Sequence, residues 1–227
     1  MFIRSLARAA VVLLAALAPA EAVAAKYSIK VATSEPPKEL QEPIRKLFGE
    51  RCVQFLDAKG ELMAEVWMRK EVPGKATPAQ VKNGLTLREV PESTVLGAMK
   101  IVKQLGDYRK QKVPPGVYTL RLGYQLQDGD HMGTAPYSEF CLVCPAADDK
   151  GDATLPVKTL HELSAKATSA HPGVFLLFPG KDAADEPKLA DKGDDTWTIL
   201  MKLSVTVGDA KTVIGIGLTL IGFSPSA

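Results

Sequence analysis

The sequence has 227 residues, with 28 basic and 26 acidic side chains and a formal net charge of +2. Charges of both signs are interspersed along it, which excludes the long basic blocks that attract nucleic acid or an anionic membrane. A chain of this length can bury a sizeable core, and one domain is the default expectation.

Residues 1–25 have the pattern of an export signal. Arg4 and Arg8 give a basic start, residues 9–17 are apolar, and Ala-Val-Ala at 22–24 is typical of a cleavage site. The apolar run is far shorter than the roughly 20 residues of a membrane-spanning helix. We therefore expect a signal peptide at 1–25 and one domain at 26–227, located in the periplasm or outside the cell, with no transmembrane span in the mature chain.

The first half of this domain reads as short strands separated by turns. Apolar residues at helical spacing predict a helix over residues 42–49, and proline-rich composition predicts a loop over residues 73–80. A turn at residues 57–60 joins two strands into a hairpin. The expected strands are residues 27–31, 52–56, 61–69, 85–90 and 95–102.

Residues 113–144 are the stretch around which the domain is arranged. From Val117 the residues alternate: Tyr118, Leu120 and Leu122 share one face, whereas Thr119 and Arg121 share the other. This period of two predicts a strand with one buried face. A polar, glycine-rich connection over residues 127–136 leads to a second apolar run at 137–144.

The remaining chain continues the same pattern. We expect a helix over residues 157–166, a buried strand over 174–178, a charged loop over 181–195, and a last hairpin of 196–207 with 212–223. Gly215 and Gly217 in the final strand indicate close backbone packing. Without strand–helix alternation, the sequence predicts a mainly β fold, an antiparallel β-sandwich of jelly-roll or immunoglobulin-like type, with two short peripheral helices.

Several short motifs resemble a family of secreted bacterial β-sandwich proteins of unknown function. The resemblance would cover most of the mature chain, and it implies an exported, sandwich-like domain with no assigned activity. The motifs that carry it are Asp107-Tyr108-Arg109, the Pro-Gly-Val-Tyr-Thr-Leu-Arg stretch at 115–121, the Asp-Gly-Asp-His-Met-Gly stretch at 128–133, Pro136-Tyr137 with Phe140, and His171-Pro172.

The connection after the central strand holds the best candidate for a metal site. Asp128, Asp130 and His131 place two carboxylates and an imidazole within four residues, and such groups bind divalent metals. The calcium-loop spacing is not met. The alternative is a polar turn that the aspartates cap, with His131 packed on Tyr137.

Three cysteines are present, two of them as Cys141-Leu142-Val143-Cys144. Inside a strand these two thiols face opposite sides, so we expect them not to bridge each other. We expect these cysteines to be buried as small hydrophobic residues, and the sequence is compatible with one disulfide from Cys52 to Cys141 or to Cys144.

No catalytic signature is present, because the chain lacks both a G-x-S-x-G elbow and an H-E-x-x-H helix. The sequence therefore favours a non-catalytic binding or structural role in the cell envelope, without a cofactor, and with an envelope protein or a glycan as partner. The expected binding surface is the rim formed by residues 127–137 with Arg109 and Arg121 nearby, including Asp128, Asp130, His131 and Tyr137. A metal-binding protein using Asp128, Asp130 and His131 is the alternative.

Overall fold

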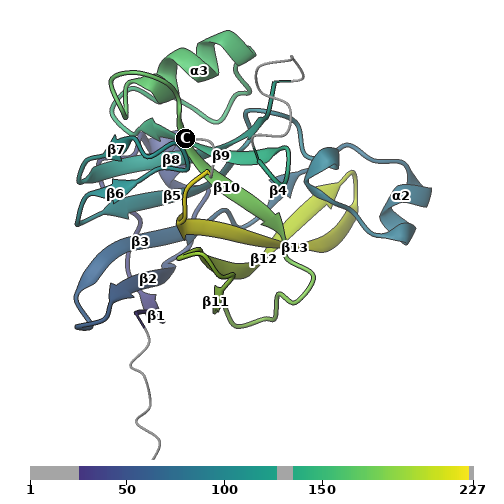
Figure 1. Ribbon diagram of the computed structural model, residues 1–227. Helices are drawn as coiled ribbons and strands as arrows, with labels where there is room; N and C mark the ends of the chain where they lie inside the picture. The colour runs from purple at the N-terminus through teal and green to yellow at the C-terminus, as the bar shows by residue number, and fades with distance from the viewer. Residues whose placement is uncertain (1–25, 127–134, 225–227) are drawn as a thin grey trace, which may run out of the picture.

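The structure is a computed structural model, and it describes residues 26–126 and 135–224. Most of its strands belong to one eleven-stranded sheet (Figure 1). The strands are β1 (Tyr27–Thr33), β2 (Arg51–Asp57), β3 (Leu62–Met68), β4 (Val72–Pro73), β5 (Val95–Ile101), β8 (Gly116–Tyr124), β9 (Glu139–Pro145), β10 (Gly173–Pro179), β11 (Lys188–Asp191), β12 (Trp197–Val207) and β13 (Ala210–Ile221). Two further strands, β6 (Leu105–Gly106) and β7 (Lys112–Val113), pair with each other.

The sheet follows a single path, β1-β2-β3-β5-β8-β9-β10-β13-β12-β11, with β4 paired in parallel to β12. Every other pair is antiparallel. Strand β10 forms the corner, because its first half, residues 173–176, pairs with β9 whereas residues 177–179 pair with β13. The protein is thus mainly β, as predicted, but the ladder continues through β10 and curls into a half-barrel instead of dividing into the two separate sheets of the expected sandwich.

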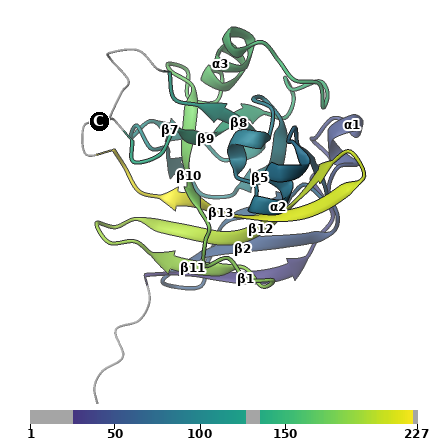
Figure 2. The ribbon, with the colours of Figure 1, turned by 90° about the vertical axis from the view of Figure 1, so that its right-hand side faces the viewer.

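The curled sheet brings its two edge strands together. Strands β1 and β11 lie side by side in Figure 2, although they form no ladder. Side chains close this seam: the Lys26 ammonium lies 2.7 Å from the Asp195 carboxylate, and the rings of Tyr27 and Trp197 meet edge to face at 5.4 Å. The inside of the curl holds the main core, to which both halves of the sheet contribute, as Phe55, Leu120, Phe175 and Ile216 show.

The central pair forms as predicted, since β8 and β9 are antiparallel neighbours. Leu120 and Leu122 face the core, but Thr119 and Arg121 on the opposite face are also fully buried. Residues 146–155 cover that second face and bond to both side chains. The expectation of one buried face on this strand was therefore wrong.

Three α-helices are present in the described chain, one more than expected. Helices α1 (Glu42–Arg45) and α3 (Val157–Ala165) lie where they were predicted. Helix α2 (Pro78–Asn83) begins inside the predicted proline-rich loop, where Thr77 and Gln80 form a capping box. A 3-10 helix, η1 (Leu87–Glu89), replaces the expected strand at 85–90, and β11 lies within the predicted charged loop at 181–195. None of the described helices has the length and apolar character that crossing a bilayer requires.

Candidate functional site

Arg121 is not on the surface where binding was expected. Its side chain is fully buried on the outer face of β8, and each of its five N–H groups has an acceptor. The guanidinium binds the Asp149 carboxylate in bidentate geometry, with Nε–Oδ2 and Nη2–Oδ1 distances of 2.7 Å each. The remaining donors bind the carbonyl oxygens of Ser93, Gly151 and Ala153. Arg121 is therefore a structural residue that ties residues 149–153 to the sheet.

A second arginine fixes the same segment. Arg69 binds Asp152 through both carboxylate oxygens, at 2.5 and 2.9 Å, and Thr119 donates a hydrogen bond to the Asp149 carboxylate at 2.5 Å. The acidic stretch at 148–152 thus lies against the sheet, because two guanidinium groups neutralise two of its carboxylates.

The structure does not bring Arg109 and Tyr137 together. Arg109 is exposed on the turn after β6, where the neighbouring Tyr108 N–H donates to the Val174 carbonyl at 2.8 Å. Tyr137, 39% exposed, packs edge to face on Phe178 with ring centroids 5.1 Å apart. Val174 and Phe178 are four residues apart on β10, which corresponds to about 13 Å along a strand.

Two of the motifs that carry the family resemblance meet at this turn. The buried Asp107 carboxylate accepts the N–H groups of Arg109 and Gln111 at 2.9 and 2.7 Å. The Gln111 side chain in turn bonds the carbonyl of Pro172 at 3.2 Å and the N–H of His171 at 3.1 Å. Asp107-Tyr108-Arg109 and His171-Pro172 therefore share a structural role, which is to hold a turn against the start of β10.

Asp128, Asp130 and His131 lie outside the described residues. The proposal that they bind a metal therefore stays a prediction, as does the polar-turn alternative. In residues 26–126 and 135–224 there is no group of three or more His, Cys, Asp or Glu side chains that could hold a metal ion.

The three cysteines are buried, as expected, and the disulfide that the sequence allowed from Cys52 does not form. All three thiols are free and buried, and Cys52 lies on β2 whereas Cys141 and Cys144 lie on β9. Strands β3, β5 and β8 lie between them, so four strand spacings of about 4.8 Å separate cysteines whose Cα atoms would need to be within about 7 Å. The prediction that Cys141 and Cys144 face opposite sides is confirmed, because Cys141 belongs to the main core and Cys144 packs with Leu142 and Leu160.

We expect these thiols to be unreactive in the folded protein. Burial, with a smaller contribution from the Glu65 carboxylate, raises the pKa of Cys52 to about 11, and burial raises the pKa of Cys141 to about 12. Burial also raises the pKa of Cys144. Because the thiolate is the reactive form, Ellman's reagent at pH 8 should label none of them until denaturant is added, when all three should react. Rapid labelling of the native protein would contradict this burial.

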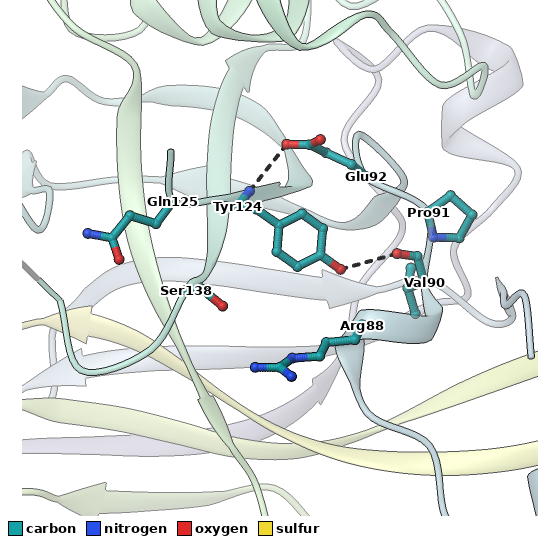
Figure 3. A pocket seen from close by; sticks show the side chains of 7 residues that line it. All are labelled: Arg88, Val90, Pro91, Glu92, Tyr124, Gln125 and Ser138. Carbon is teal, nitrogen blue, oxygen red and sulfur yellow. Dashed lines mark hydrogen bonds between the residues drawn. The ribbon is translucent and has the colours of Figure 1, made fainter. Parts of the chain in front are cut away.

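The candidate binding site is a groove of about 630 Å³ at the end of the β8–β9 hairpin (Figure 3). One wall is residues 88–92, which follow from η1 towards β5, and the other is the last residue of β8 with the residues next to β8 and β9, Gln125 and Ser138. The lining combines apolar side chains with donors and acceptors: Arg88, Val90, Pro91, Glu92, Tyr124, Gln125 and Ser138.

Short hydrogen bonds fix the groove. The Tyr124 hydroxyl donates to the carbonyl of Leu87 at 2.8 Å, with the Val90 carbonyl at 3.3 Å, so the ring cannot turn away. Glu92 accepts the Tyr124 N–H at 3.3 Å (Figure 3). This tyrosine therefore joins the two walls, and the groove keeps its shape without a ligand.

The charges around Tyr124 are mostly negative. Burial is the main cause that raises the pKa of Tyr124 to about 12, and the carboxylates of Glu139, Glu92 and Glu89 add to it. Arg88 offsets part of this negative charge, because its Nε lies 3.7 Å from Glu139. The offset is only partial, since the Arg88 side chain is 76% exposed to solvent. The hydroxyl of Tyr124 thus remains protonated and bound to the main chain at all physiological pH values.

Sequence reasoning missed the first wall of this groove. It predicted a strand over residues 85–90, although Thr86 and Glu89 have the spacing of a capping box, which indicates a helical turn. The second wall lies within the predicted central stretch, where the alternation from Val117 assigns Tyr124 to the same face as Leu120 and Leu122. The groove can hold a ligand by ring contact and hydrogen bonds. No family model, curated protein or solved structure matches this chain.

Proposed function

We propose that this protein is an exported, non-catalytic binding module of the cell envelope and that it binds an envelope glycan in the Tyr124 groove. The observation that carries the proposal is the groove itself, in which an immobilised aromatic ring lies beside side chains that donate and accept hydrogen bonds. The export signal expected at 1–25 and the resemblance to secreted β-sandwich proteins give the location. Both remain part of the proposal.

A saccharide suits this lining in three ways. A volume of about 630 Å³ is within the usual range for small-ligand sites and accommodates a few sugar rings. The C–H face of a pyranose packs on apolar surface such as Tyr124, Val90 and Pro91, and its hydroxyls both donate and accept hydrogen bonds. Arg88 and Glu92 line the groove, and the carboxylates of Glu139 and Glu89 also act on Tyr124, so an anionic ligand is disfavoured and a neutral one suits the groove.

The non-catalytic part of the proposal depends on how the reactive groups are held. The Tyr124 hydroxyl is bound to two carbonyls and its pKa is raised, so it is a poor general base. The three thiols are buried with raised pKa values: Cys141 lies in the main core, Cys52 packs with Ile44 of α1, and Cys144 packs with Leu160 of α3. What the groove offers a ligand is therefore contact and hydrogen bonding.

We expect short N-acetylhexosamine oligomers to bind the mature protein saturably, as measured by calorimetry. Arg88→Ala and Ser138→Ala should each weaken binding about tenfold, because each removes a hydrogen bond worth about 1–1.5 kcal/mol from the site. Both changes leave the Tyr124 contacts intact, so the fold should persist.

Lys158→Ala is the matched control, because Lys158 is 90% exposed on α3 and belongs to neither wall. Absence of saturable binding, or binding that both groove variants leave unchanged, would count against the groove as a glycan site.

A further inference from the structure

A second groove lies on the outer face of the sheet, over β3 and β5. It measures about 450 Å³, and residues 34–39 form its outer wall. The lining residues are Ser34, Glu35, Pro36, Pro37, Lys38, Glu39, Glu65, Trp67 and Lys100. This groove does not share a residue with the Tyr124 groove, so it is an independent site.

The outer wall is held in place on both sides. The Trp67 indole N–H donates to the Ser34 carbonyl at 2.9 Å, and the Ser34 N–H donates to the Glu50 carbonyl at 2.6 Å. Pro36 and Pro37 restrict the backbone between these contacts and the start of α1. The Trp67 indole is only 1% exposed, so it fixes the wall from beneath, and the half-buried Pro36 gives the groove its accessible apolar side.

Opposite charges lie next to each other on the floor of the groove. Glu65 and Lys100 are direct partners in the β3–β5 ladder, where side chains of paired residues begin about 5 Å apart. Glu65 is only 8% exposed, and one of its oxygens accepts the Gln54 amide at 3.0 Å. Within the described residues that amide is the only hydrogen-bond or ion-pair partner of Glu65, and Lys100 does not approach it within 4.0 Å.

In this arrangement Glu65 and Lys100 can each still pair with a charged group of a ligand. A nearly buried carboxylate with one neutral donor is poorly compensated, and it gains most from a cationic partner. Lys100 is exposed and can turn over the groove to meet an anion. A ligand that carries both charges a few bonds apart would satisfy the two residues together, whereas a simple ion would satisfy one.

We propose that this groove binds a small zwitterion, a free amino acid or a dipeptide. The ligand ammonium pairs with Glu65, its carboxylate pairs with Lys100, and its side chain lies against Pro36 on the outer wall. The site requires neither a metal nor a chemical step, and it does not depend on whether the Tyr124 groove binds a glycan.

Trp67 supplies the readout. The chain has two tryptophans, and replacing Trp197 by phenylalanine leaves Trp67 as the only one. In this background we expect dialanine to change the Trp67 fluorescence saturably. Glu65→Gln and Lys100→Ala should each weaken binding at least tenfold, since each removes one of the two ion pairs.

Blocked probes test the charges of the ligand. N-acetyl-dialanine lacks the ammonium and dialanine amide lacks the carboxylate, so each should bind at least tenfold more weakly than dialanine. The control Lys30→Ala removes an exposed lysine of β1 that does not line the groove, and it should leave binding unchanged. Equal binding of dialanine and either blocked probe, or the absence of a saturable change, would overturn the proposal.

Discussion

Replacing Asp149 by alanine is expected to destabilise the protein by about 3–5 kcal/mol, a large part of the stability of an ordinary domain. The substitution removes the carboxylate that binds Arg121 twice at 2.7 Å and accepts the Thr119 hydroxyl at 2.5 Å. The guanidinium would then remain fully buried with its charge uncompensated. Urea denaturation monitored by circular dichroism measures the loss directly.

The neighbouring Asp148 provides the control. It pairs with Lys166 at 3.1 Å, but both side chains are about half exposed, and such a surface pair contributes no more than about 1 kcal/mol. Asp148→Ala and Asp149→Ala therefore differ by one position in sequence and by several kcal/mol in expected effect. A similar, small loss for both variants would show that water reaches Arg121 and that residues 149–153 do not cover it.

The ion pair of Arg121 with Asp149 shows what alternation in a sequence can and cannot predict. The period of two assigned Arg121 to the correct face of β8, opposite Leu120 and Leu122. It could not reveal that this face is covered, because the covering carboxylate comes from Asp149, 28 residues later and beyond β9. An arginine in a strand is normally exposed, so the expected binding role for Arg121 was reasonable from sequence and wrong in three dimensions.

Local signals predicted most elements correctly. The turn at 57–60 forms as expected, with Asp57 accepting the N–H groups of Lys59 and Glu61 and Gly60 at a φ of 77°. The curl of the sheet could not be predicted in this way. It depends on β10 exchanging β9 for β13 along seven residues, and strand order is set by long-range contacts that periodicity does not encode.

The candidate sites, too, could be predicted from the sequence only in part. Tyr124 and Trp67 were placed on predicted strands, but each groove also needs a wall from a distant segment, residues 88–92 in one case and 34–39 in the other. Those walls are short, irregular segments that contain proline. The pattern of hydrophobic residues therefore does not predict where in the fold they lie. Both grooves therefore became visible only in the structure.

Replacing Gly215 by alanine is expected to prevent folding or to cost at least about 3 kcal/mol, at the upper end of overpacking effects. A Cβ atom at this position would lie 1.9 Å from the Gly180 carbonyl oxygen and 3.1 Å from the Ala183 Cβ. The nearest atom belongs to the backbone, so no side-chain rotation can relieve the clash. Gly180 also donates its N–H to the Gly215 carbonyl at 2.9 Å, where β10 ends against β13. The sequence-based expectation of close backbone packing at Gly215 is thus confirmed.

The effect of Gly215→Ala should extend beyond this residue, because β10 is the corner through which the two halves of the half-barrel connect. Separating Gly180 from Gly215 should loosen the ladder of residues 177–179 with β13, and hydrogen exchange should show lost protection in both strands. Gly49→Ala is the control, because a Cβ there meets nothing within 4 Å, and its cost should stay within about 0.5 kcal/mol. A soluble Gly215→Ala protein with the melting temperature of Gly49→Ala would mean that β10 and β13 do not meet at this point, and the single curled sheet would have to divide there.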